Sequence, residues 1–346
     1  MHTIQEKILF FGALLSGAAG CSTAAGPAAS PKVDVDSSFS PNPDPSRDGG
    51  APVTSSRKGY VGLFGDNAIA VLDTVTNRVT KTIPVTAPDG LIVTPDGRMV
   101  YVSSGDTGSV KVISTDSDAI VASIDVGAKP AGLAITPDGR RVVVAVGGAN
   151  EAVIIDTSTR TVVKHMTVEQ AHASCISADG RSAFVGSQAT SAPAVVMIDI
   201  AGDAPPMLFA VDKSPRMLAC TPAEIYFTAV GLDAVEALDP ATGVIGQPIP
   251  SGGSPHDVRS TQDGKFELVV SQSAGDLEFI DLASSTVVAK VPTGKLPHWI
   301  ALTTDGNQAY VTNEGDNNVV IVDLGARRVT DTIAIGKAPR KMALQP

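Results

Sequence analysis

The residues of this sequence that could do chemistry recur at one fixed position of a repeated pattern. Three of the four histidines that follow residue 57 occupy it, together with two arginines and one aspartate. In chain order the residues at this position are Asp89, Ala131, His172, Arg216, His256, His298 and Arg340, each preceded by proline except His172, which follows Ala171. Arginine and histidine side chains that lie together can bind an anion, and a histidine can also act as a general base or a metal ligand. The pattern therefore predicts a site if the fold brings these positions together.

Two further landmarks show that the chain after residue 57 is built from one repeated unit. Asp-Gly pairs recur at steps of 42, 41, 84 and 42 residues, namely Asp96-Gly97, Asp138-Gly139, Asp179-Gly180, Asp263-Gly264 and Asp305-Gly306. The slot without a pair holds Pro222-Ala223-Glu224 instead. Aspartates that close an apolar run recur at a similar interval: Asp73, Asp156, Asp199, Asp239, Asp281 and Asp323. We expect the side chains of these closing aspartates to cap their own turns, which leaves them no part in the chemistry.

Each unit contains about four apolar runs of strand length separated by tight-turn residues, which indicates antiparallel strands. A period in the low forties with four strands per unit is typical of a β-propeller, and seven units fit the usual number of blades. The first unit starts at Tyr60 without an inner strand, and the last ends at 340–344 with an inner strand alone. The sequence therefore predicts an all-β, seven-bladed β-propeller over residues 58–346, with four-stranded antiparallel blades and a ring closed by pairing the N- and C-terminal strands in one blade.

Several units share residues with a known repeat. Tyr310-Val311-Thr312-Asn313 is the tetrapeptide of the YVTN-type β-propeller repeat, and the stretch from Gly127 to Gly139 carries the fuller pattern of glycine, two residues, proline, a strand and Pro-Asp-Gly. Over residues 58–346 the chain therefore resembles that family, as a bacterial lipoprotein member. The resemblance implies the propeller fold but no particular activity, because such propellers host unrelated functions.

The first 57 residues are expected to lie outside the propeller. Residues 1–20 contain a short apolar core and end in Ala18-Ala19-Gly20, directly before Cys21, which is typical of a lipoprotein signal peptide whose cleavage leaves Cys21 lipidated. Residues 21–57 are rich in Ser, Pro, Ala, Gly and Asp and predict a disordered tether. We expect the propeller to be held in the bacterial cell envelope by its N-terminal lipid alone, at the outer membrane if the source is Gram-negative. The alternative is an ordinary signal peptide with an incidental cysteine.

The propeller fold would gather the recurring residues at one mouth of its central channel. The segment that carries them links the outer strand of one blade to the inner strand of the next, and we expect the side chains of Asp89, His172, Arg216, His256, His298 and Arg340 to form a ring there. Around the seven slots lie the basic residues Lys129, Lys213, Arg216, Lys295, Lys337, Arg340 and Lys341, against the acidic residues Asp89, Glu169, Asp212 and Asp257. This indicates a locally positive mouth that binds an anion. The alternative is a polar ring without a ligand. We expect replacement of Arg216, Arg340 and His298 together by alanine to leave the fold intact, since these positions are polar and peripheral to packing.

Composition narrows the function. The net charge of −10 and the isoelectric point near 4.9 exclude a general nucleic-acid footprint. The sequence has no Gly-rich phosphate loop, no His-Glu-x-x-His, no Cys-x-x-Cys and no Gly-x-Ser-x-Gly. We therefore expect a monomeric binding or interaction module that carries no cofactor and takes a small anionic molecule or an envelope partner protein.

Two other functions fit the same residues. Ser254-Pro255-His256 and Leu296-Pro297-His298 are similar to Pro-His segments of the seven-bladed lactonases, which implies a hydrolase with Arg216 and Arg340 holding the substrate and a histidine as general base. A metal-handling or redox accessory protein would use His256 and His298 as ligands.

Cys175 and Cys220 are the two cysteines left once Cys21 is lipidated, and export to an oxidising compartment permits a disulfide between them. They fall at opposite parity in the inner strands of consecutive blades, so their side chains can point either toward each other or directly apart. Two buried free thiols are the alternative. The single tryptophan, Trp299, follows His298 and is expected to pack between blades.

Overall fold

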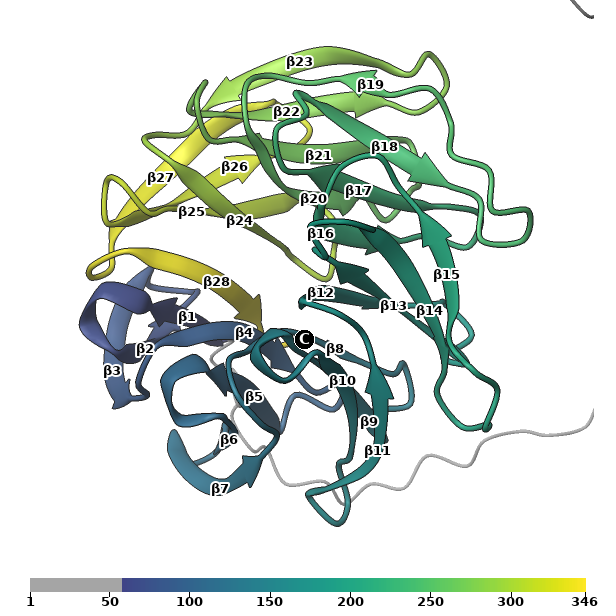
Figure 1. Ribbon diagram of the computed structural model, residues 1–346. Helices are drawn as coiled ribbons and strands as arrows, with labels where there is room; N and C mark the ends of the chain where they lie inside the picture. Colours follow the sequence, from purple (N-terminus) through teal and green to yellow (C-terminus); the bar gives the residue numbers. More distant parts are fainter. Residues whose placement is uncertain (1–57) are drawn as a thin grey trace, which may run out of the picture. The chain divides into compact units, whose positions relative to one another are not determined.

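The computed structural model describes residues 58–346, which form seven four-stranded antiparallel sheets arranged around a central channel (Figure 1). The sequence-based prediction of a seven-bladed β-propeller is confirmed. The predicted signal peptide, the lipidation of Cys21 and the tether of residues 21–57 lie outside the described residues. No helix of residues 58–346 is long and apolar enough to cross a membrane.

Within each sheet the strands follow one another from the channel outward. One sheet holds β4 (Pro88–Val93), β5 (Met99–Ser104), β6 (Ser109–Ser114) and β7 (Ala119–Asp125), and the next β8 (Pro130–Ile135), β9 (Arg141–Val146), β10 (Glu151–Asp156) and β11 (Thr161–Thr167). Then come β12 (Ala171–Ile176), β13 (Ser182–Ser187), β14 (Ala194–Asp199) and β15 (Met207–Ala210), followed by β16 (Pro215–Cys220), β17 (Ile225–Ala229), β18 (Ala234–Leu238) and β19 (Ile249–Pro250). Two more sheets follow. The first contains β20 (Pro255–Ser260), β21 (Phe266–Ser271), β22 (Asp276–Asp281) and β23 (Thr286–Pro292). The second contains β24 (Pro297–Leu302), β25 (Gln308–Asn313), β26 (Asn318–Asp323) and β27 (Arg328–Ala334). Short 3-10 helices follow three strands: η1 (Phe64–Asp66), η2 (Gly105–Thr107) and η3 (Gly147–Ala149).

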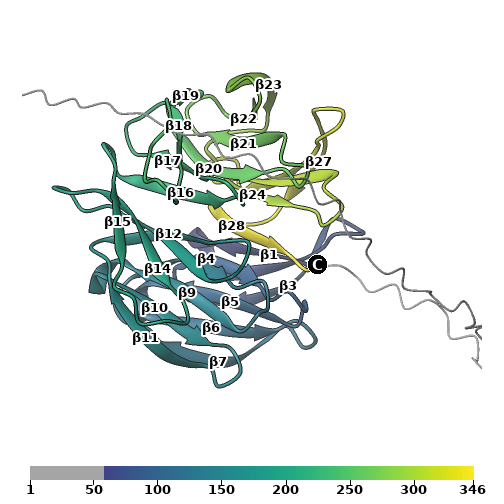
Figure 2. The ribbon, with the colours of Figure 1, turned by 90° about the vertical axis from the view of Figure 1, so that its right-hand side faces the viewer.

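The seventh sheet is built from both ends of the described chain. β28 (Pro339–Leu344) is its inner strand, and β1 (Lys58–Leu63), β2 (Ala68–Asp73) and β3 (Arg78–Pro84) complete it. Tyr60 pairs with Ala343 and Val61 with Met342 in an antiparallel register, so β1 and β28 lie side by side (Figure 2). This closure, predicted from the incomplete first and last units, pairs two strand edges that would otherwise be exposed.

The hydrophobic core lies between blades. Each cluster of buried apolar side chains draws on two adjacent sheets; for example, Val143 and Ile154 of one blade pack against Val185 and Val196 of the next. Strands in the middle of a blade are therefore covered on both faces and read as continuous apolar runs, as in β9, whereas outer strands such as β11 are largely exposed.

The turn aspartates have the structural role expected of them. At Asp138-Gly139 the Thr136 hydroxyl and the Arg140 backbone N–H both donate to Asp138 Oδ1, at 2.5 and 3.0 Å, and Gly139 adopts a φ of 71°. The closing Asp156 accepts the backbone N–H groups of Ser158 and Thr159, at 2.9 and 3.0 Å. The other closing aspartates cap their turns in the same way: Asp73, Asp199, Asp239, Asp281 and Asp323. In the blade that lacks an Asp-Gly pair, the Thr221 hydroxyl stabilises the corresponding turn by accepting the backbone N–H groups of Ala223 and Glu224.

Cys175 on β12 and Cys220 on β16 are joined by a disulfide between neighbouring inner strands, with their Cα atoms 5.6 Å apart. Of the two orientations that strand parity left open, the structure has the one in which the side chains face each other. The bond links two blades next to the channel.

Candidate functional site

The recurring site residues lie in a bulge at the start of each inner strand. In β20 the pairing with β21 jumps from Pro255 to Val258, and in β24 the pairing with β25 jumps from Pro297 to Trp299. The same irregularity follows the first residue of every other inner strand that starts a sheet, and β28 has its counterpart against β1. A bulge re-aims side chains that regular pairing would direct into a blade face. The repeat thus provides seven similar positions at one mouth of the channel, and their residues can vary without disturbing the sheets.

Hydroxyl groups of the neighbouring blade fix the backbone of several bulges. Thr228 Oγ1 donates to the carbonyl oxygen of His256 at 2.6 Å, and Thr312 Oγ1 donates to that of Arg340 at 2.6 Å. Ser103 Oγ does the same for Ala131, at 2.7 Å. The site residues are therefore held from the preceding blade as well as by their own strand.

His256 and His298 form a buried pair. Their side chains leave only 5% and 7% of the residue surface exposed, and their ring centroids are 3.9 Å apart. Burial and the positive charges around them lower the pKa of both well below its ordinary value, so both are neutral at pH 7. Neither Nδ1 atom has a hydrogen-bond partner in the described part of the chain. The expectation that His298 is peripheral to packing is wrong, because its ring is turned inward against that of His256.

His172, on β12, belongs to the same electrostatic group as this pair. Burial lowers its pKa to about 4, and the charges of Lys341 and Arg216 act in the same direction against that of Asp89. The charge of His172 in turn depresses the pKa values of His256 and His298. A cavity of about 580 Å³ at this side of the mouth is lined by His172, Asp89 and Arg340.

The two arginines of the mouth differ in their partners. Arg340 donates to Glu314 Oε1 through Nη2 at 3.1 Å and stacks on the Phe64 ring with its Cζ atom 3.6 Å from the centroid. Arg216 has neither an ion pair nor a side-chain hydrogen bond with any residue of 58–346, although burial lowers its pKa. The positive rim expected from the sequence is thus partly neutralised, whereas Arg216 keeps a half-buried charge that has no direct partner within residues 58–346 and feels the Glu314 carboxylate only at a distance.

Two charges that the sequence placed at the rim, without a role of their own, are buried and directly follow the predicted positions. Lys341 is 2% exposed, with Nζ 3.8 Å from Asp89 Oδ1, and burial lowers its pKa. Asp257 is fully buried, accepts the Ile300 backbone N–H at 3.0 Å, and has its pKa raised by burial to about 6. The corresponding residue of the other units is Gly90, Gly132, Ala173, Met217 or Trp299. A charged residue in a slot otherwise filled by small or apolar residues was the signal that could have identified both.

The Trp299 ring packs against inter-blade apolar clusters, as expected, and also faces the channel. It lies in the channel, with Arg259 Cζ 4.1 Å and Lys341 Nζ 4.9 Å from its centroid, and its Nε1 donates to the Met342 carbonyl oxygen at 2.8 Å. Among the described residues no three histidine, cysteine or acidic side chains are grouped so that they could hold a metal ion.

Comparison with known proteins supports the fold class. A model of the YNCE-like β-propeller family matches residues 222–345. Among curated proteins no sequence matches the chain significantly. The chain is therefore placed among β-propeller proteins, with the family match confined to its last blades.

Three solved structures that resemble the chain are distant from it in sequence. A functionally unknown protein from Desulfotomaculum acetoxidans is 16% identical with a TM-score of 0.71, over 84% of this chain and 99% of that one. A candidate 6-phosphogluconolactonase from Bacteroides fragilis is 17% identical with a TM-score of 0.70, over 85% and 99%. Kuenenia stuttgartiensis hydrazine synthase is 20% identical with a TM-score of 0.66, over 75% and 90%. Such likeness shows the propeller architecture and does not specify an activity.

Proposed function

We propose that this protein is a binding propeller whose channel mouth takes a small anion, with Arg216 as the main cation and His172, His256 and His298 as neighbouring donors. The observation that carries the proposal is the half-buried Arg216, whose guanidinium group has no partner in residues 58–346. A buried charge without a partner is costly unless something supplies one, and an anion bound at the mouth would do so. Asp89, Arg340 and Lys341 then line the same opening as paired charges.

The histidines give such a site a pH dependence. In the free protein their imidazoles are neutral at pH 7, because burial and nearby cations lower their pKa values. A bound anion would stabilise the imidazolium form and raise those pKa values, so binding takes up protons. Affinity should therefore increase as the pH falls from 7 toward 5.

The test is calorimetric titration of the purified protein with sulfate, phosphate, acetate and citrate, comparing wild type with Arg216→Gln and Lys213→Gln. Lys213 is exposed and lies three residues before Arg216, so its variant removes the same net charge without altering the mouth interior. We expect the Arg216 variant to lose at least about tenfold in affinity, since hydrogen bonds to charged groups contribute about 1.5–3 kcal/mol, and the Lys213 variant to bind as wild type does. Equal losses in both variants, or no binding of any of the four anions, would overturn the proposal.

A lactone hydrolase is the second candidate, favoured by one specific feature. A general base must be neutral at working pH, and the depressed pKa values of His256 and His298 keep them so beside Arg216. The candidate 6-phosphogluconolactonase from Bacteroides fragilis shares the architecture. Hydrolysis of gluconolactone or its 6-phosphate above the spontaneous rate, lost in His256→Gln, would establish this function in place of pure binding.

We further propose that the mature protein is lipidated at Cys21 and acts in the bacterial cell envelope. The support is the apolar run that ends in Ala18-Ala19-Gly20-Cys21. Labelling of cells with an alkyne fatty acid should mark the wild type and leave Cys21→Ala unlabelled. Equal labelling of both would contradict the anchor.

A further inference from the structure

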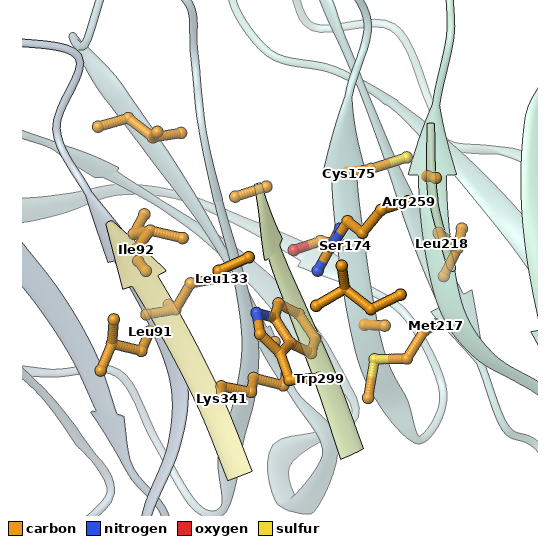
Figure 3. A pocket seen from close by; sticks show the side chains of 18 of the residues that line it. Leu91, Ile92, Leu133, Ser174, Cys175, Met217, Leu218, Arg259, Trp299 and Lys341 are labelled. Carbon is orange, nitrogen blue, oxygen red and sulfur yellow. The ribbon is translucent and has the colours of Figure 1, made fainter. Parts of the chain in front are cut away.

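Beyond the mouth residues the channel holds a second cavity, which shares only Lys341 with the charged residues of the mouth. It has a volume of about 490 Å³ and is lined by the later residues of all seven inner strands (Figure 3). Its walls are largely apolar, with Leu91, Leu133, Met217, Leu218 and Ile300 among them. We call this cavity the far chamber. The last residue of every inner strand is partly exposed, so solvent reaches the chamber from the end opposite the histidines. Its volume is within the usual range of about 300–1,000 Å³ for small-molecule sites.

One cation projects into the far chamber with free donors. Arg259 Nε lies 3.2 Å from Asp257 Oδ2, and the guanidinium plane is stacked on the Trp299 ring. Its two terminal nitrogens have no hydrogen-bond acceptor within residues 58–346, and Figure 3 shows Arg259, Trp299 and Ser174 pointing into the same space. Stacking and the Asp257 contact hold the guanidinium group in one orientation, which is the arrangement that suits recognition of a carboxylate.

The charges around Arg259 leave it able to hold an anion. Asp257 is shared with Lys341, which lies on the other side of the Trp299 ring and reaches Asp89 at 3.8 Å toward the mouth. A second carboxyl group that interacts with Arg259 is that of Glu267 on β21. It is buried, accepts a hydrogen bond from the Ser260 hydroxyl, and has its pKa raised by burial to about 7, so it is about half protonated at neutral pH.

We propose that the far chamber is a second ligand site, which takes a small monocarboxylate with an apolar or aromatic body. The carboxylate would pair with the free edge of the Arg259 guanidinium, and the body would lie against Trp299 and the Leu133 and Leu218 side chains. Such a ligand uses both features of the chamber, because its apolar body lies against the leucine and tryptophan side chains while its carboxylate pairs with the guanidinium group of Arg259. The site is independent of the proposed anion site at the mouth.

Trp299 provides a direct readout, since it is the only tryptophan in the sequence. Octanoate should change the selectively excited Trp299 emission saturably, and octanol, which has the same chain without the charge, should bind at least about tenfold more weakly. Arg259→Gln should reduce octanoate affinity to that of octanol. Arg216→Gln, at the mouth, should leave octanoate binding unchanged.

Because Arg259→Gln also leaves Asp257 without its partner, a second variant keeps the test decisive. Ser174→Leu fills the chamber from β12 and leaves the Asp257–Arg259 ion pair in place, and the Ser174 hydroxyl has no hydrogen-bond partner in the described residues. With an unchanged melting temperature, this variant should lose octanoate binding. Unchanged binding in Ser174→Leu, equal binding of octanoate and octanol, or a loss in Arg216→Gln equal to that in Arg259→Gln would each overturn the proposal. Each of these outcomes can be distinguished from failure of the proposed mouth site, which would appear as no binding of sulfate or phosphate.

Discussion

The two ends of the channel are made by the same seven strands, yet their chemistry is opposite. At the mouth the inner strands are bulged, and the residues there are histidine, arginine and aspartate. In the far chamber the strands are regular, and apolar residues such as Leu133 and Leu218 line the wall. Regular alternation directs successive side chains into the two spaces on either face of the blade, which selects apolar residues throughout the strand. A bulged position is released from that packing. The comparison shows where a propeller can vary its function without a cost to its core.

Asp257 lies between the two ends, and its removal should have the largest effect. In Asp257→Ala the Ile300 N–H loses its acceptor, Arg259 loses its ion-pair partner and Lys341 loses a nearby negative charge. Losing one partner of a buried charge pair costs about 3–5 kcal/mol in the free energy of unfolding. Urea denaturation measures it, with the exposed Asp203→Ala as a control expected within about 0.5 kcal/mol of wild type. If the two variants are equally stable, Asp257 does not organise the channel.

The disulfide distinguishes the far chamber from the mouth, because both cysteines line the chamber and no covalent link joins blades at the mouth within residues 58–346. Replacing Cys175 and Cys220 by serine opens a loop of 45 residues and should destabilise the protein by about 4 kcal/mol. Thiol titration of the unfolded, unreduced protein should find neither cysteine free. Two free thiols at these positions would contradict the bridge.

The pH dependence of stability should have opposite signs at the two ends. The folded-state pKa of Glu267, about 7, is above its ordinary value of 4.5. The contribution of this group to the free energy of unfolding is therefore complete below about pH 4.5 and is lost as the pH rises through 7. The mouth histidines have lowered pKa values, so their stabilisation is complete above about pH 6.5 and is lost as the pH falls.

Single variants separate the two contributions. Between about pH 4.5 and 8, wild type should lose roughly 3 kcal/mol of unfolding free energy relative to Glu267→Gln, which does not titrate. His172→Gln should instead lose less stability than wild type as the pH is lowered from about 6.5 to 4. Parallel pH profiles for wild type and Glu267→Gln would show that the carboxyl group is not held protonated by burial.

The sequence predicted those features of the fold that depend on residues close together in the chain. The turn at Asp138-Gly139 and the cap by Asp156 depend on neighbours two or three positions away, and the repeat of these units determined seven blades and their closure. The mouth register was also visible, because the proline before each site residue marks the start of an inner strand.

What the sequence did not predict depends on the bulges and on partners from other blades. The bulge turns two consecutive residues inward, so Asp257 and Lys341 were assigned to the rim without a separate role, and His298 was taken as peripheral. Trp299 enters the channel for the same reason. The pairing of Arg340 with Glu314, 26 residues earlier, depends on the angle between two blades, which no local pattern encodes. Arg216 lies in the same register as Arg340 and has no such partner, so only the structure separates the two arginines.

The most direct test of the anion site is the number of protons taken up when sulfate binds. Calorimetric titration at about pH 6, in two buffers of different ionisation enthalpy, measures that number, since sulfate itself does not titrate there. The account predicts that wild type takes up protons when sulfate binds. Uptake should be smaller in His172→Gln and in the double variant in which His256 and His298 are replaced by glutamine. In Arg216→Gln, sulfate should bind at least about tenfold more weakly. Sulfate binding without proton uptake, or uptake that persists when all three histidines are replaced, would contradict it.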